Sequence, residues 1–377
     1  MRFYLIAGEP SGDALGAALM AGLKELLPDV EFSGVGGPLM QAQGLHSQFP
    51  MDELSVMGLA EVLPKYRALK RRIAECAETV LAQKPDALIT IDSPDFCLRV
   101  AKIVKAQSNT RTIHYVAPSV WAWREGRAAK MARVIDHVLA LLPFEPPLMQ
   151  AAGMGCDFVG HPVVAEPQAT PDQAQDFRTR HGLNDAPLLL ALPGSRRGEV
   201  ERLMPVFGET VRQLLNEHPK MRIVLPAAPS VAARVRELAS GWPVSPLVLD
   251  AAILPEKRAV FAAADVALAA SGTVSLELAA ANTPMVIAYD MNWLSRNLIG
   301  RMLKVDTVTL VNLVSETRVV PEFLGKNCVP DKIALGVLAV LNNPQNQQQA
   351  MALTMERLGR DQEPPGLRAA RAVLQAL

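Results

Sequence analysis

The stretch Leu188-Leu-Leu-Ala-Leu-Pro-Gly-Ser-Arg-Arg-Gly-Glu199 decides the fold of the second half of this 377-residue chain. An apolar run that ends in a glycine and serine turn followed by arginines is typical of a buried parallel strand leading into a helix. Such turns lie at the carboxyl ends of strands, where the free N–H groups of helix N-termini attract anions. We therefore predict a phosphate contact at this turn, made by Gly194, Ser195 and Arg196.

A second turn of this kind follows the apolar strand 266–269. The amides of Ser271, Gly272 and Thr273 could hold another phosphate, and Glu277, one turn further on, could accept hydrogen bonds from two ribose hydroxyls. Ordinary turn, capping and helix-dipole chemistry also explains each turn taken alone. Because both turns occur in the same half of the chain, the pattern favours a nucleotide diphosphate site.

Neither turn matches a dinucleotide-binding or P-loop motif. The nearest G-x-G-x-x-G candidate, which begins at Gly34, fails at its third glycine, and the sequence contains no G-x-x-x-x-G-K-[ST]. NAD enzymes and P-loop ATPases are therefore disfavoured.

The remainder of the chain alternates short β-rich runs with helical patterns, which predicts an α/β fold with parallel sheets. A polar, proline-containing stretch at 165–172 separates two such series and predicts domains at 1–165 and 166–343. Residues 344–377 are expected to form helices that pack back on the N-terminal domain or on a partner protomer. Two domains of this size imply a cleft between them. Strands are expected at 2–7, 86–91, 112–116, 138–142, 188–192, 222–225, 247–249, 266–269 and 285–288.

Composition excludes several classes of protein. Lys plus Arg and Asp plus Glu number 38 each, so no overall positive charge favours nucleic acid. The four cysteines form no CxxC pair and are expected to be reduced, buried thiols in a cytosolic protein. No apolar run reaches the roughly 18 residues that a spanning helix needs, so the chain is not expected to cross a membrane.

The candidate catalytic residue is Asp92, at the end of the apolar strand 86–91. The residues that follow have structural explanations, because Ser93 can cap the next helix, Pro94 suits its first position and Asp95 complements its dipole. Asp92 has no such explanation. A carboxylate at the carboxyl end of a strand can act as general base on a sugar hydroxyl, and we predict that role.

Two other turns of the N-terminal half supply candidate acceptor or cleft residues. Glu9, Ser11 and Gly12 follow the first strand, while Trp121 and Trp123 follow the strand 112–116. The aromatic rings could stack on a sugar or face an acyl chain, although core packing and ordinary loop chemistry explain them equally well.

Residues 54–80 form an apolar helical stripe interleaved with basic side chains. This pattern could rest on anionic lipid, and a basic solvated face above a core-facing stripe is the alternative. The candidate acyl or membrane contacts are Met57, Leu59, Val62, Leu69, Arg71 and Arg72.

Taken together, these segments resemble the lipid-A-disaccharide synthase family of GT-B glycosyltransferases. The resemblance covers nearly the whole chain. Pro10 and Ser93 depart from the family, which more often has alanine at both positions, but neither change removes a polar group. The matching segments are Gly8–Asp13, Ser55–Gly58, Ile91–Phe96, Pro118–Trp123, Leu142–Glu145, Gly160–His161, Leu192–Arg196, Ser271–Thr273, Leu276–Glu277 and Asn312–Leu313.

The resemblance implies two Rossmann-like domains around a central cleft and an inverting hexosyl transfer. The donor would be UDP-2,3-diacylglucosamine and the acceptor 2,3-diacylglucosamine 1-phosphate (lipid X), giving the β-1,6 disaccharide 1-phosphate and UDP. Asp92 would be the base, Arg196 a donor-phosphate contact and Asn312 a further UDP contact. No cofactor or metal is expected, because no Asp-x-Asp motif is present and helix N-termini with arginine can stabilise UDP.

Because both implied substrates carry acyl chains, the resemblance favours an acyl or membrane contact for 54–80. It also implies a cytoplasmic protein associated peripherally with the inner membrane, and is compatible with a homodimer. Two other functions stay open. A UDP-N-acetylglucosamine 2-epimerase would release free sugar without lipid X, and a nucleotide-sugar-binding protein would bind UDP without turnover.

Overall fold

The computed structural model describes residues 1–54, 59–122, 126–183, 185–291 and 305–377. The chain divides into two compact units. Unit 1 contains residues 1–165 and 358–377, and unit 2 contains residues 166–357.

Unit 1 is built on a parallel sheet of seven strands in the order β3-β2-β1-β4-β5-β6-β7. Phe3 of β1 pairs with Phe32 of β2 on one side and with Ala87 of β4 on the other. The strand order therefore reverses between β1 and β4. The strands are β1 (Arg2–Ala7), β2 (Glu31–Val35), β3 (His46–Ser47), β4 (Ala87–Ile91), β5 (Arg111–Tyr115), β6 (His137–Ala140) and β7 (Gly155–Phe158).

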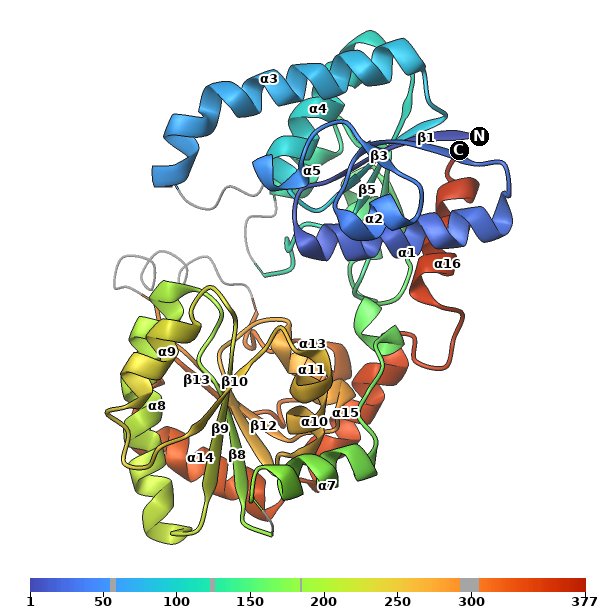
Figure 1. Cartoon of the computed structure of the whole chain (residues 1–377). Coiled ribbons are helices and arrows are strands. Elements are labelled where there is room, and N and C mark those ends of the chain that lie inside the picture. Colours follow the sequence, from blue (N-terminus) through green and yellow to red (C-terminus); the bar gives the residue numbers. More distant parts are fainter. Residues whose placement is uncertain (55–58, 123–125, 184, 292–304) are drawn as a thin grey trace. The chain divides into compact units, whose positions relative to one another are not determined.

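Helices cover both faces of this sheet, because successive side chains of a buried strand point to opposite faces. Phe3 and Leu5 belong to the core under α1 (Pro10–Leu26), α2 (Pro38–Ala42) and α16 (Pro365–Gln375). Tyr4 and Ile6 belong to the opposite core. That core is covered by α3 (Leu59–Gln83), α4 (Pro94–Gln107), α5 (Gly126–Met131) and α6 (Pro146–Ala151). The last helix, α16, packs beside α1 (Figure 1).

Unit 2 repeats this plan with six parallel strands in the order β10-β9-β8-β11-β12-β13, which reverses between β8 and β11. The strands are β8 (Leu188–Leu192), β9 (Arg222–Ala227), β10 (Leu247–Asp250), β11 (Val266–Ala269), β12 (Met285–Tyr289) and β13 (Glu322–Leu324). One core lies under α8 (Arg197–Glu217), α9 (Ala232–Ala239) and α14 (Pro330–Asn342). The other face carries α7 (Pro171–Arg180), α10 (Leu254–Ala263), α11 (Val274–Ala280), α13 (Leu310–Ser315) and α15 (Gln345–Arg357) (Figure 1).

All nine predicted strands are present, with ends within two residues of the expected ones. The predictions missed β2, β3, β7 and β13, which lie toward the sheet edges and are more exposed than the central strands. Without burial on both faces, these strands lack the continuous apolar run that marks a central parallel strand. The four predicted buried cysteines are all buried.

Candidate functional site

The strand order of each sheet reverses once, and the predicted site turns follow the strands at that reversal. In open parallel sheets, ligands bind beyond the carboxyl ends of the strands at such a switch point. In unit 1, β1 leads into residues 8–13 and β4 leads into residues 92–95. In unit 2, β8 leads into residues 193–199 and β11 leads into residues 270–273. Each sheet thus brings two predicted turns side by side.

At the unit 1 switch point the turns after β1 and β4 touch. A methyl group placed on Gly8 would lie 2.6 Å from Ser93 Oγ. The backbone N–H of Asp92 donates to the carbonyl of Tyr115 at 3.0 Å, which fixes the end of β4 against β5. The Asp92 side chain is half-buried, and within the described residues no side chain donates a hydrogen bond to its carboxylate. The carboxylate can therefore accept one from a ligand.

The prediction that the Ser93 side chain caps the next helix is wrong. Ser93 occupies the N-cap position of α4, and Pro94 follows it in the first turn as predicted, but the Ser93 side chain makes no capping hydrogen bond. Its backbone is left-handed, with φ 44° and ψ 53°. An ordinary capping side chain starts from extended backbone, so this geometry directs the Ser93 hydroxyl toward Gly8 instead.

The turn after β1 places Glu9 at the N-cap of α1, with Ser11 exposed in the first turn of the helix. Gly12 is buried, and a methyl group there would lie 3.4 Å from the carbonyl of Ile91. The next residue, Asp13, is 2% exposed and accepts the backbone N–H groups of Gly37, Leu39 and Met40 at 2.9 to 3.0 Å. Asp13 therefore caps α2.

Trp121 packs edge-on against Phe144, with ring centroids 5.5 Å apart and an interplanar angle of 82°. This contact joins the loop after β5 to the loop after β6. Trp123 lies outside the described residues. Beside Phe144, Glu145 is 4% exposed and accepts the backbone N–H of Leu142 at 3.0 Å. Burial raises the pKa of Glu145 to about 7.

Glu145 carries no predicted role, although it ends one of the matching segments. Only its burial in the folded chain distinguishes it from an ordinary loop carboxylate.

At the unit 2 switch point, the backbone N–H of Ala270 donates to the carbonyl of Leu192 at 2.8 Å and joins the two turns. Gly194 has φ 103°, a conformation that side chains rarely adopt. Glu199 of α8 accepts the N–H of Arg196 at 3.3 Å, and its other oxygen lies 3.6 Å from Arg196 Nη1. Ser195 is exposed and the Arg196 side chain is 69% exposed, so both can reach a ligand.

In the second turn of unit 2, Gly272 and Thr273 are exposed and Ser271 is half-buried. Glu277 lines a pocket of about 370 Å³, and its carboxylate is paired with the ammonium group of Lys257 from α10. Sequence reasoning missed Lys257, because 20 residues separate it from Glu277 and no motif contains it.

Asn312 is not brought to the surface of these turns. It is 1% exposed, its amide nitrogen donates to Val320 O at 3.0 Å and Thr307 Oγ1 at 3.2 Å, and its oxygen accepts Val320 N–H at 3.0 Å. The amide group therefore holds the loop before β13. A direct UDP contact by Asn312 stays a prediction.

The candidate lipid contacts divide among several environments. Met57 lies outside the described residues, as do the side chains of Leu59 and Val62. Leu69 packs against the core of unit 1. Arg72 makes a two-pronged ion pair with Glu53, with both N–O distances 2.8 Å, and a third contact with Glu75 at 2.7 Å. Arg71 is 65% exposed and is the described candidate that faces solvent.

Arg72 thus has a structural function, which is to tie η1 (Met51–Glu53) to α3. No helix in the described part of the chain combines the length and apolarity needed to span a bilayer.

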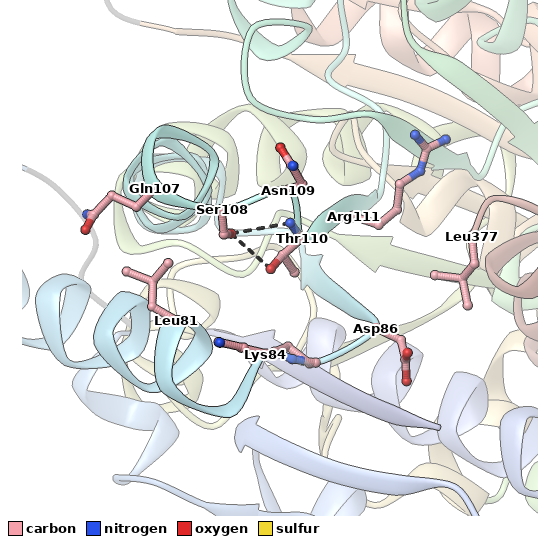
Figure 2. Close-up of a pocket in the computed structure, with 10 residues that line it drawn as sticks. Leu81, Lys84, Asp86, Gln107, Ser108, Asn109, Thr110, Arg111 and Leu377 are labelled. Carbon is pink, nitrogen blue, oxygen red and sulfur yellow. Dashed lines mark hydrogen bonds between the residues drawn. The ribbon is translucent and has the colours of Figure 1, made fainter.

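A pocket of about 750 Å³ lies elsewhere in unit 1, where α3 and α4 end and β4 and β5 begin (Figure 2). Lys84, Asp86 and Arg111 line it, and Ser108 Oγ bonds to the N–H and hydroxyl of Thr110. It opens at the amino end of the strands, opposite Asp92. It therefore contains none of the predicted site residues.

Comparison with known proteins identifies the family. The family model for lipid-A-disaccharide synthetase matches residues 3–373. A lipid-A-disaccharide synthase from Ruegeria pomeroyi is 65% identical over 383 residues, covering 100% of this chain and 96% of the relative. The chain belongs to the lipid-A-disaccharide synthase family. The corresponding enzyme of Rhodospirillum centenum is 48% identical and covers 100% of this chain and 95% of the relative. The predicted family and its enzyme class, glycosyl transfer in lipid A biosynthesis, are confirmed.

Solved structures show the same fold at low sequence identity. UDP-GlcNAc 2-epimerase from Neisseria meningitidis, bound to UDP-GlcNAc, has a TM-score of 0.62 at 12% identity, covering 100% of this chain and 99% of that one. MurG from Acinetobacter baumannii has a TM-score of 0.59 at 13% identity, and the match covers 100% of this chain and 99% of the MurG chain. These similarities and the two parallel sheets confirm the predicted GT-B fold.

Proposed function

We propose that the chain transfers the 2,3-diacylglucosaminyl group of UDP-2,3-diacylglucosamine to lipid X, giving the β-1,6-linked disaccharide 1-phosphate and UDP. The full-length match to lipid-A-disaccharide synthases is the observation that carries this proposal. The switch points support it, because unit 1 offers a carboxylate and unit 2 offers exposed amides and a guanidinium group. We assign the acceptor to unit 1 and the donor nucleotide to unit 2.

Asp92 acts as the general base in this proposal. The acceptor hydroxyl donates its hydrogen bond to the Asp92 carboxylate. As the hydroxyl oxygen attacks the anomeric carbon from the face opposite UDP, its proton passes to Asp92 and the bond to the UDP oxygen breaks. A positioned base is typically worth about 10²- to 10⁴-fold in rate. The carboxylate suits this task because no described side chain occupies it.

Unit 2 stabilises UDP as the leaving group. The negative charge that develops on the diphosphate meets the N-terminus of α8, a helix of 21 residues, together with the Arg196 guanidinium group. The Glu199 carboxylate orients Arg196 by contacting both the backbone N–H and the guanidinium group of Arg196. Ser195 and the amides of 271–273 add further donors, and Glu277 accepts the ribose hydroxyls. Asn312 supports this surface by fixing the loop before β13.

We further propose that the chain works at the cytoplasmic face of the inner membrane without spanning it. Both substrates carry acyl chains that water does not solvate well. The exposed Arg71 on α3 is assigned to anionic lipid headgroups, and Met57, Leu59 and Val62 are the candidates for contacts with acyl chains. Trp121 and Glu9 are assigned to the acceptor side. A homodimer is compatible with this arrangement.

The test is an incubation of the purified chain with UDP-2,3-diacylglucosamine, with and without lipid X, followed by mass spectrometry. We expect UDP and disaccharide 1-phosphate in equal amounts, and only when lipid X is present. Free diacylglucosamine without lipid X would indicate epimerase-like hydrolysis. UDP binding without any turnover would instead make the chain a nucleotide-sugar-binding protein.

A further inference from the structure

The pocket beside Glu277 contains a set of charges that the proposed reaction does not yet explain. It lies in unit 2, between the segment before α7 and the helices α10 and α11. Glu166 and Glu277 contribute two carboxylates, and Lys257 and Arg258 contribute two cations. A pocket with balanced charge offers little net attraction to a phosphate group. It suits an uncharged, hydroxyl-bearing part of a ligand.

Within this pocket Lys257 is held in one place by two contacts. Its ammonium group bonds to Glu277 Oε2, and it also lies over the ring of Phe261, 5.4 Å from the centroid. The Lys257 and Glu277 side chains are 25% and 31% exposed, so the ion pair is partly shielded from water. Phe261 comes one turn after Lys257 on α10, which fixes the direction from which the ammonium group approaches.

The ion pair leaves Glu277 able to accept more hydrogen bonds. Each carboxylate oxygen has two lone-pair sites, and Lys257 uses one site on one oxygen. Glu166 lies close enough for the Glu277 charge to affect it. Burial raises the pKa of Glu166, Glu277 raises it further, and Lys257 and Arg258 oppose the rise. Without Lys257, less positive charge would offset the repulsion between the Glu277 and Glu166 carboxylates. The Glu277 side chain would then be freer to rotate away from Glu166.

We propose that Lys257 is a positioning residue of the nucleotide site, which holds the Glu277 carboxylate in the orientation that accepts two ribose hydroxyls. This inference rests on the proposed function, in which Glu277 contacts the ribose. Lys257 does not touch the phosphates or the reacting atoms. Its removal should therefore weaken recognition of the ribose and leave binding of the diphosphate intact.

The experiment compares UDP with 2′-deoxy-UDP by isothermal titration calorimetry on the full-length chain. The wild type should prefer UDP by roughly ten- to a hundredfold, the usual range for a hydrogen bond to a charged group. Lys257→Met should reduce this preference severalfold while its affinity for 2′-deoxy-UDP stays within about twofold of the wild type. Lys257→Arg should restore most of the preference. If Lys257→Met does not fold, Lys257→Gln carries the same measurement.

Arg258→Met is the matched control, because it removes a neighbouring cation from the same pocket and should change the two affinities equally. Combining Lys257→Met with Glu277→Gln should cost no more preference than Glu277→Gln alone. An unchanged preference in Lys257→Met, or tighter binding of UDP, would overturn the inference. If Glu277→Gln abolishes the preference but Lys257→Met does not, only this inference fails. A wild type without preference, or without UDP binding, overturns the ribose contact of the proposed function as well.

Discussion

The carboxyl edges of the two sheets place ligand-facing turns at equivalent switch points but build them from different residues. In unit 1, Asp92, Ser93 and Val116 have positive φ angles of 51°, 44° and 85° without being glycine. In unit 2, the residues with positive φ in the turns after β8 and β11 are glycines, Gly194 at φ 103° and Gly272 at φ 153°. Non-glycine residues in this region cost of order 1–3 kcal/mol each, and such strain gathers at functional sites. We infer that the unit 1 edge is shaped for reactive side chains and the unit 2 edge for backbone amides.

The acidic side chains at these two edges also differ, in whether a cation pairs with them. In unit 2, Glu199 and Glu277 are each paired with a cation. In unit 1, Glu145 is buried beside backbone groups and Asp92 has no described side-chain partner. Paired acids bind and orient, whereas unpaired acids are available for proton transfer.

The largest effect is expected at Asp92. Asp92→Asn keeps the size of the side chain but removes its basicity, so turnover should fall about 10²- to 10⁴-fold. Steady-state kinetics and UDP titration check this, and affinity for UDP should stay unchanged because the proposed nucleotide site lies in unit 2. Turnover within threefold of the wild type would remove Asp92 from the mechanism.

The next largest effect concerns the buried acid of unit 1. The pKa of Glu145 is raised from 4.5 to about 7, so the folded state binds its proton more tightly than the unfolded state. Stability from this group is therefore fully present below about pH 4.5 and is lost as the pH rises through about 7. The pKa difference corresponds to about 3 kcal/mol.

Native-state hydrogen exchange of the β6 amides at pH 4.5 and pH 8 measures this loss. Glu145→Gln, which cannot ionise, should lose less stability over the same range. Equal losses in the variant and the wild type would show that Glu145 does not titrate in this way.

A smaller effect is expected on the donor side. Arg196→Ala removes the guanidinium group that we propose contacts the diphosphate, and it should weaken UDP binding by about 1.5–3 kcal/mol. The neighbouring exposed Arg197, which pairs with Glu201, provides the matched control Arg197→Ala. Calorimetric titration with UDP distinguishes them, and equal losses in both variants would indicate a general charge effect.

The smallest effects test the backbone difference itself. Ser93→Gly relieves the strain of a left-handed serine, but glycine loses more backbone entropy on folding, which offsets roughly 0.5–1 kcal/mol of the gain. The net change should be at most about 1 kcal/mol toward a more stable protein. Gly194→Ala introduces a methyl group 2.5 Å from a Glu199 carboxylate oxygen and should destabilise unit 2 by about 1–2 kcal/mol. Thermal unfolding of both variants measures these changes. Opposite signs from those expected would mean that strain does not distinguish the two edges.

Local residue patterns are enough to predict the chemistry of individual segments of this protein. Apolar runs such as Leu188–Leu192 form buried strands because both faces of a parallel strand are covered. The turns around Asp92, Gly194 and Ser271 follow from residue types that end strands and begin helices. These local rules predicted nine of the strands, an α/β fold with parallel sheets and the positions of the candidate turns along the chain, whereas the GT-B fold was implied by the family resemblance.

Which turns become neighbours, and what their side chains contact, depends on how the whole chain packs. The order of strands places β4 beside β1, so Ser93 lies against Gly8, 85 positions away in the sequence. Packing brings Lys257 to Glu277 and Arg72 to Glu53, so that each pair forms an ion pair, and it buries Glu145. Such contacts depend on the distances between elements that are remote in sequence, and no local propensity encodes those distances.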